Sequence, residues 1–110
     1  MTKVEAIIQP ARLDMVKEAL IQLGVEGMTI SDVRGHGRQK GHTAVYRGRE
    51  YEVSLLPKME IEVVMPDDRV DEAIKSIIGA ARTGEIGDGR VFVIPVIQSY
   101  KIRTGELDSL

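Results

Sequence analysis

The feature that most constrains the fold is a strand–helix–strand pattern that occurs twice within 110 residues. In the first copy, Val4, Ala6 and Ile8 alternate with polar residues, which is typical of a half-buried strand. Apolar residues at helical spacing follow as far as Gly24, where the predicted helix ends. Residues 28–35 then predict a second strand.

The second half of the chain repeats the pattern. Residues 59–65 alternate apolar and acidic side chains, which predicts a third strand that ends at a proline. Asp67 or Asp68 is the predicted N-cap of a second helix, whose apolar stripe runs over residues 70–78. Residues 91–97 predict a fourth strand.

This order of elements predicts an α+β fold, a ferredoxin-like βαββαβ sandwich with a long loop between strands 2 and 3. Residues 1–110 fit one domain, since domains have roughly 100–200 residues. Helices are expected on one face of the sheet. Candidate apolar residues for the other face are Val4 or Ile7, Val64 and the far side of residues 91–97. With no chain left to cover that face, self-association is expected.

Composition excludes several classes of protein. The absence of cysteine excludes disulfides, zinc–thiolate sites and thiol catalysis. A net charge of −2 is too acidic for a protein that coats nucleic acid, so no nucleic-acid partner is expected. No apolar run approaches the ~20 residues of a membrane span, and the first residues have no signal-peptide core. A cytoplasmic protein without membrane insertion is therefore expected.

The long loop, residues 36–55, differs in charge from the rest of the chain. Its four cations and two carboxylates give it a net charge of +2, which leaves −4 for the remaining residues. It also carries Tyr46 and Tyr51, two of the four aromatic residues. These properties favour an interaction arm, and the alternative is a solvated hairpin without function.

Three segments combine cations with glycines or a strand end. The glycine-rich loop, residues 82–90, has three glycines in six positions beside Arg90. Gly35 and Gly37 precede Arg38 in the same manner, and Lys101 and Arg103 lie in a C-terminal loop, residues 101–110. Glycines let backbone N–H groups approach an anion closely, and arginine donates to phosphate. The segments together favour a site for a nucleotide polyphosphate.

Other chemistries fit less well. Residues 84–90 lack the lysine and the hydroxyl of a P-loop and precede a strand rather than a helix, and no dinucleotide fingerprint is complete. His36 and His42 leave open a metal site in the long loop, although a solvated loop is the simpler interpretation. Glu60 and Glu62 form a carboxylate pair or the polar side of a strand. The first and third strands lack the aromatic residues on which RNA-recognition modules stack bases.

Four segments resemble the PII signal-transduction proteins of nitrogen regulation, in order and over nearly the whole chain. They are Gly35–His42, Tyr46–Tyr51, Thr83–Val93 and Arg103–Glu106. The resemblance implies a homotrimer that binds ATP or ADP between adjacent subunits. By the family pattern, the phosphates would face Arg38, Arg90, Lys101 and Arg103 and the backbone of Gly37, Gly87, Asp88 and Gly89, and Thr29, Glu62 and Val64 would line the adenine and ribose.

The resemblance also implies 2-oxoglutarate beside Mg-ATP. Gln39 would be the protein ligand of Mg²⁺ and Lys58 would pair with a carboxylate of the acid. The backbone of Gln39, Lys40, Gly41 and Gly87 would complete that pocket. Tyr51 occupies the position that many members uridylylate and some adenylylate. Implied partners are an ammonium channel, a nucleotidylyltransferase, a sensor kinase or a biosynthetic kinase.

Three departures from the family pattern bear on function. His36 stands where an aromatic residue is usual, Arg49 replaces a small residue near Tyr51, and Arg90 and Lys101 exchange arginine and lysine. The expected protein is a regulator and not an enzyme. The alternatives are a small ATP-handling enzyme, such as a weak ATPase, and a trimeric metal-responsive protein of similar architecture.

Overall fold

The computed structural model describes residues 1–36 and 55–108, and the backbone of residues 43–46 and 49–52. The elements follow one another as β1 (Thr2–Ile8), the 3₁₀ turn η1 (Pro10–Arg12), α1 (Leu13–Gln22), β2 (Thr29–Gly35), β3 (Thr43–Tyr46), β4 (Arg49–Glu52), β5 (Leu56–Met65), the 3₁₀ turn η2 (Asp67–Arg69), α2 (Val70–Ala81) and β6 (Gly89–Pro95).

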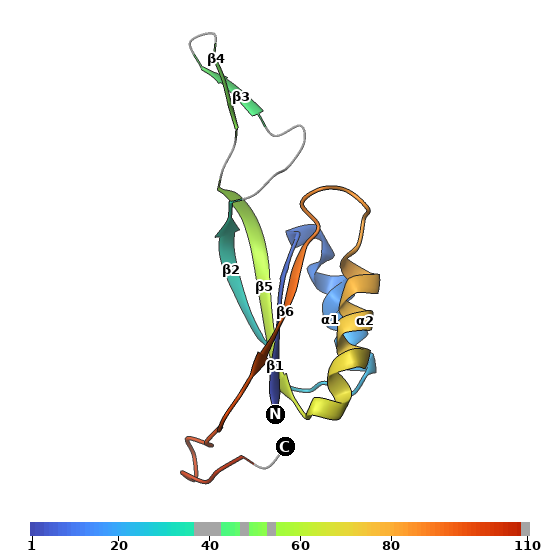
Figure 1. The fold of residues 1–110 in the computed structure, drawn as a ribbon, viewed down its shortest axis with the longest axis vertical. Coiled ribbons are helices and arrows are strands. Elements are labelled where there is room, and N and C mark those ends of the chain that lie inside the picture. Colours follow the sequence, from blue (N-terminus) through green and yellow to red (C-terminus); the bar gives the residue numbers. More distant parts are fainter. Residues whose placement is uncertain (37–42, 47–48, 53–54, 109–110) are drawn as a thin grey trace.

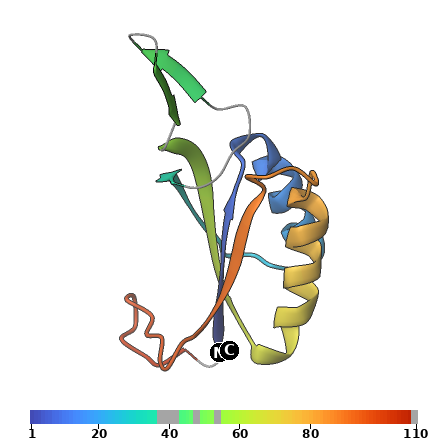
Figure 2. The same ribbon diagram turned by 45° about the horizontal axis from the view of Figure 1, so that its top comes forward.

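Four strands form one antiparallel sheet in the order β2-β5-β1-β6. The two central strands, β1 and β5, belong to different halves of the chain, so each half completes the other. Both helices lie on the same side of this sheet (Figures 1 and 2). The α+β fold and its ferredoxin-like order of elements are therefore confirmed.

The core lies between the sheet and the helices. Alternate residues of β1 are buried, so Val4, Ala6 and Ile8 face the helices as period-two strand geometry requires. Val16 and Leu20 of α1 are fully buried against them. The remaining buried apolar residues come from β5 and α2: Ile61, Val63, Met65, Val70, Ala73, Ile77 and Ala81.

The opposite face of the sheet, called the open face below, carries the other set of strand residues. Cross-strand neighbours share a face, and Glu5 of β1 lies between Glu62 of β5 and Phe92 of β6. The open face mixes apolar and charged residues: Lys3, Glu5, Ile7, Thr29, Ser31, Val33, Glu60, Glu62, Val64, Arg90, Phe92 and Ile94.

The structure decides one open alternative of the sequence-based prediction and corrects one detail of it. Of the two candidates in β1, Val4 lies under the helices, whereas Ile7 faces the open side with Lys3 and Glu5. Neither Asp67 nor Asp68 caps α2, because a 3₁₀ turn intervenes and no side chain caps the helix. Asp67 instead accepts hydrogen bonds from the Thr2 hydroxyl at 2.5 Å and the terminal amino group at 2.9 Å. These contacts lower the pKa of Asp67, with the Thr2 hydroxyl as the larger cause.

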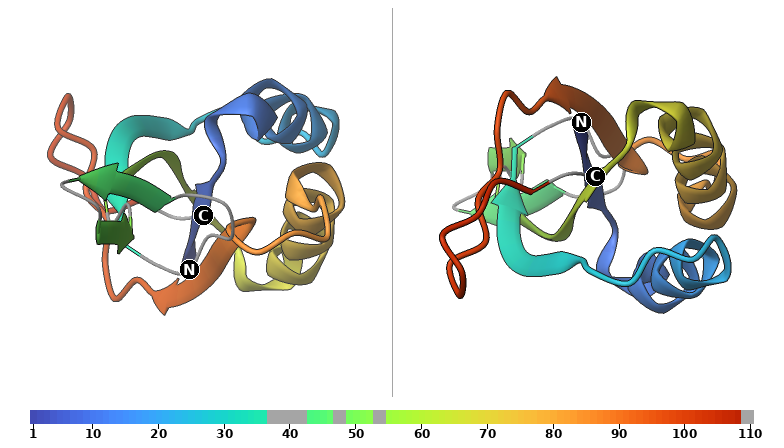
Figure 3. Two further views of the ribbon diagram at one scale, coloured as in Figure 1. Left: turned by 90° about the horizontal axis from the view of Figure 1, so that it is seen from above. Right: turned by 90° about the horizontal axis from the view of Figure 1, so that it is seen from below.

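Two segments extend beyond the sandwich. Strands β3 and β4 pair as a hairpin within the predicted long loop, beyond the ends of β2 and β5 (Figure 1). Tyr51 therefore lies within β4, opposite Ala44, and not at the tip of the loop. The segment after β6 runs on the side of the sheet away from the helices (Figure 3).

Candidate functional site

A pocket of about 820 Å³ lies at the end of the sheet where β2 ends and β6 begins, the upper end in Figure 1. This upper pocket contains five of the predicted ligand residues on two segments that are far apart in the sequence. They are Lys58, Gly87, Asp88, Gly89 and Arg90. Gly35 and His36 line the same pocket.

The glycine-rich loop in this pocket is organised by its own aspartate. The Asp88 carboxylate accepts hydrogen bonds from the backbone N–H groups of Thr83, at 2.8 Å, and Gly84, at 2.9 Å. It also accepts one from the Thr83 hydroxyl. These bonds, that of the Thr83 hydroxyl first, lower the pKa of Asp88. The carboxylate is therefore occupied within the loop, and it is the backbone of Asp88 that can serve an anion.

Gly89 holds the end of this loop against β1. Its φ is +106°, and a Cβ atom at this position would lie 1.8 Å from the backbone oxygen of Ile7. Only glycine fits such a close approach of two strands without moving the backbone. Gly89 was predicted as a phosphate ligand, but its first role is to let β6 pack closely against β1.

Lys58 links β5 to the glycine-rich loop. Its side chain is only 8% exposed, and its ammonium group donates a 2.7 Å hydrogen bond to the Gly87 carbonyl. The stem of the side chain runs along Gly35, where an added Cβ would lie 3.2 Å from Lys58 Cγ. An ammonium group has three N–H donors, so donors remain for an anion in the same pocket.

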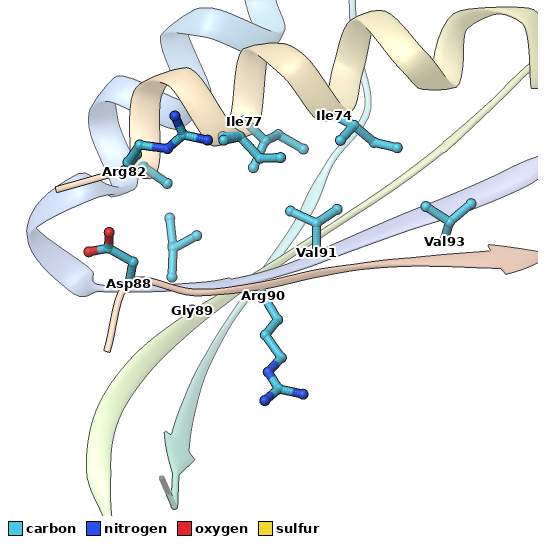
Figure 4. Close-up of a pocket in the computed structure, with 11 residues that line it drawn as sticks. Ile74, Ile77, Arg82, Asp88, Gly89, Arg90, Val91 and Val93 are labelled. Carbon is cyan, nitrogen blue, oxygen red and sulfur yellow. The ribbon is translucent and has the colours of Figure 1, made fainter. Parts of the chain in front are cut away.

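Arg90 lines both the upper pocket and a neighbouring groove, but its charged end faces away from the groove. An apolar groove of about 340 Å³ lies between α2 and β6, with Ile74, Ile77, Val91 and Val93 along it. Figure 4 shows the guanidinium of Arg90 directed away from this groove. Its register opposite Ile7 puts it on the open face, where it adds a second cation to the upper pocket.

A second pocket, of about 640 Å³, lies at the other end of the sheet. This lower pocket contains Thr29, Glu62 and Val64, the three residues predicted for adenine and ribose. Thr29 and Glu62 are cross-strand neighbours on the open face, which explains how residues 33 positions apart meet. The connection between α1 and β2 forms another wall, from Leu23 to Met28.

The C-terminal cations lie at this same lower end. Tyr100 forms an isolated β-bridge with Leu107, so residues 100–107 fold back on themselves (Figure 1). Within that turn, the Lys101 N–H donates to the carbonyl of Glu106, and the Gly105 N–H donates to the carbonyl of Lys101. Lys101 and Arg103 are both exposed. Ser99 and Asp108, at the base of the turn, line the lower pocket.

One chain therefore does not bring all of the predicted ligands together. The upper and lower pockets lie at opposite ends of strands such as β2, whose length is about 20 Å at the usual rise per residue. Arg90 belongs to the upper group, whereas Lys101 and Arg103 belong to the lower end. The predicted ligands Gly37, Arg38, Gln39, Lys40 and Gly41 lie outside the described residues, as does His42 of the open metal alternative.

Comparison with known proteins identifies the family. The family model described as Nitrogen regulatory protein P-II matches residues 1–106. The chain belongs to the P-II family. Nitrogen regulatory protein P-II of Rhodobacter capsulatus is 58% identical over 106 residues, which cover 96% of this chain and 95% of that protein. Nitrogen regulatory protein P-II 1 of Escherichia coli (strain K12) is 56% identical over 108 residues, or 98% and 96% of the two chains.

Membership of the P-II family assigns the chain to the signal-transduction regulators of nitrogen metabolism. The predicted resemblance is thus confirmed over nearly the whole sequence. Within the described part of this P-II chain, no helix has the length and apolar character needed to cross a bilayer.

The open face of this P-II protein also carries a carboxylate cluster. Glu5, Glu60 and Glu62 each have a carboxylate oxygen within 4.8 Å of the others. The Lys3 ammonium lies 4.0 Å from Glu62. A hydrogen bond with Glu62, partial burial and repulsion from Glu5 raise the pKa of Glu60. The alternating pattern of the third predicted strand indicated only the pair Glu60 and Glu62. Glu5 lies on another strand and joins the cluster through the β1–β5 register.

Sequence reasoning missed several residues of the upper pocket. Ile7, Glu85, Ile86 and Phe92 line it, and although three of them lie in the family-like segment Thr83–Val93, none was predicted as a ligand. Gln9 was not among the predicted ligands either, yet its side-chain amide donates to the Gly87 carbonyl at 3.3 Å.

Proposed function

We propose that this P-II protein is a regulator that binds ATP or ADP between adjacent copies of a homotrimer. The observation that carries the proposal is the division of the predicted ligands between two pockets at opposite ends of one sheet. A nucleotide that needs both groups must take them from two chains. A cyclic assembly repeats the same head-to-tail contact, so every upper pocket would meet a lower one.

The chemistry of each pocket suits a different part of the nucleotide. The upper pocket offers Lys58, Arg90 and the backbone of a glycine-rich loop, which are donors suited to phosphate. The lower pocket has a threonine, a glutamate and several apolar residues, which suit a ribose and a base. Lys101 and Arg103, at the lower end, would reach the phosphates from the neighbouring subunit.

The proposed second effector is 2-oxoglutarate, bound with Mg-ATP. Lys58 is its proposed carboxylate partner because it is buried, cationic and already directed into the upper pocket. Gln39 is the proposed protein ligand of Mg²⁺, with the backbone of Gln39, Lys40, Gly41 and Gly87 around the acid. The metal would supply an electrostatic link between the phosphates and the acid, and so couple the two ligands.

The proposed output is the long loop, residues 36–55. Its base borders the upper pocket through Gly35 and His36, so ligands there can select among loop conformations. The loop would act on target proteins such as an ammonium channel, a nucleotidylyltransferase, a sensor kinase or a biosynthetic kinase. Tyr51 is the proposed site of uridylylation or adenylylation.

Calorimetry tests this function. We expect 2-oxoglutarate to bind only when Mg²⁺ and ATP are both present, and ADP to leave the acid without measurable affinity. Binding of the acid without nucleotide would contradict the proposed coupling. Lys58→Met should abolish acid binding while ATP still binds, because the side chain keeps its length and loses its charge.

A further inference from the structure

Gln9 and the glycine-rich loop are joined by a contact that the predicted ligand set does not include. Gln9 follows β1 directly, and its backbone carbonyl accepts a 2.9 Å hydrogen bond from the Arg12 N–H in the turn that starts α1. Its backbone is therefore fixed. Its side-chain amide donates to the Gly87 carbonyl, 78 positions away in the sequence.

The Gly87 carbonyl accepts from two side chains at once. Lys58 Nζ lies 2.7 Å from the oxygen and Gln9 Nε2 lies 3.3 Å from it. The lysine bond is shorter and carries a charge, so it is the stronger of the two. Gly89 adds a third attachment through its close contact with Ile7. The loop is thus attached to the end of β1 by Gln9 and Gly89, and to β5 by Lys58.

The direction of the Gly87 carbonyl also sets the direction of a neighbouring donor. In a trans peptide, the carbonyl of one residue and the N–H of the next lie in one rigid plane and point in opposite directions within it. Holding the Gly87 carbonyl toward Gln9 and Lys58 therefore directs the Asp88 N–H the other way. That N–H belongs to the backbone proposed to bind phosphate.

We infer that Gln9 is a positioning residue that keeps the Gly87–Asp88 peptide in place when Lys58 is shared with an acid. This inference rests on the proposed function, in which Lys58 pairs with a carboxylate of 2-oxoglutarate. Without acid, Lys58 alone suffices to hold the carbonyl. With acid, the ammonium group divides its donors, and the amide of Gln9 maintains the peptide orientation on which the phosphates depend.

The inference separates the effects of one substitution on two ligands. Gln9→Met keeps the length of the side chain and removes its N–H donor. We expect ATP alone to bind this variant within about twofold of wild type, and 2-oxoglutarate in the presence of Mg-ATP to bind about fivefold more weakly, the effect of one neutral hydrogen bond. Gln22→Met is the matched control, because that amide donates to Glu18 on the exposed side of α1.

Calorimetric titration of these variants tests whether Gln9 positions the Gly87–Asp88 peptide. Gln9→Lys restores a donor to the Gly87 carbonyl and should recover the affinity for the acid, which a general loosening of the fold would not do. Unchanged acid affinity in Gln9→Met would overturn the inference, and so would an equal loss of ATP and acid affinity together with a lower melting temperature. If wild type binds no acid with Mg-ATP, the proposed function fails first and the inference fails with it.

Discussion

The two faces of the sheet are built on different principles. In β1 and β5, the face under the helices carries aliphatic side chains that are almost wholly buried, such as Val4, Ile8 and Ile61, and Leu20 and Ile77 of the helices pack on this layer. The open face alternates carboxylates and cations with large apolar residues, of which Val64 is 40% and Phe92 45% exposed. The same four strands therefore have one face that contributes to a buried apolar core and one exposed face that is partly apolar and partly charged.

This difference separates folding from assembly. Burial of a complete aliphatic layer stabilises the single chain, at about 1.5–3 kcal/mol for each large side chain removed from water. Exposed apolar residues beside charges on a flat sheet are typical of a surface that contacts another molecule. Both pockets also have walls on the open face, so ligand binding and association would use the same surface.

The largest expected effect is in the core between the sheet and the helices. Leu20→Ala should lower the free energy of unfolding by about 2–5 kcal/mol, because Leu20 is fully buried and its removal leaves a cavity. Val64→Ala on the open face should cost less than half as much. Urea denaturation at one fixed chain concentration measures both, since association adds to apparent stability. Equal losses would mean that the two faces do not differ as described.

A charge on the open face should have the next largest effect. Phe92→Asp is expected to weaken self-association at least tenfold, because assembly would bury a carboxylate that has no partner. Ile21→Asp on α1 is the matched control, since Ile21 is 52% exposed and Phe92 45%. Sedimentation over a range of concentrations measures the association constants. If both variants associate like wild type, the open face is not the contact surface.

The smallest expected effect concerns the carboxylate cluster. The raised pKa of Glu60 means that the folded state binds its proton more tightly than the unfolded state does, where the pKa is near 4.5. Its contribution to stability is thus fully present below that pH and is lost as the pH rises through the raised value. Glu60→Gln should flatten this dependence and gain up to about 1 kcal/mol at pH 7, the scale of exposed charge pairs.

Unfolding free energies measured from pH 4 to pH 8 test this prediction. Glu18→Gln, on the exposed side of α1, supplies a control for the loss of one negative charge. A stability profile of Glu60→Gln that stays parallel to that of wild type would show that the cluster does not titrate as described.

Most of the fold followed from the sequence because burial dictates it. The alternation of Val4, Ala6 and Ile8 and the helical spacing of Val16 and Leu20 reflect the face that each element buries. The prediction failed at the start of α2, where donors from distant parts of the chain compete for a carboxylate that could cap the helix. Asp67 resembles a helix cap in sequence, but the Thr2 hydroxyl and the amino terminus, brought near by the sheet, take its carboxylate instead.

The candidate site was only partly predictable. Glycines and cations marked the segments, and the family pattern supplied the roles of residues such as Thr29 and Lys58. Which residues share a pocket depends on strand register, which sequence alone did not give. The contact of Gln9 with Gly87 and the addition of Glu5 to the carboxylate cluster arise in this way, from neighbours that are distant in sequence.

The central claim is that two chains complete each nucleotide site, and mixed oligomers test it most directly. Arg90→Ala damages the upper pocket and Arg103→Ala the lower end, so each variant alone should bind ATP weakly. Each trimer that contains both variants should regain one of its three sites at wild-type affinity, so random mixing of equal amounts should restore about a quarter of all sites. Mixed trimers in which no site regains wild-type affinity would contradict the account.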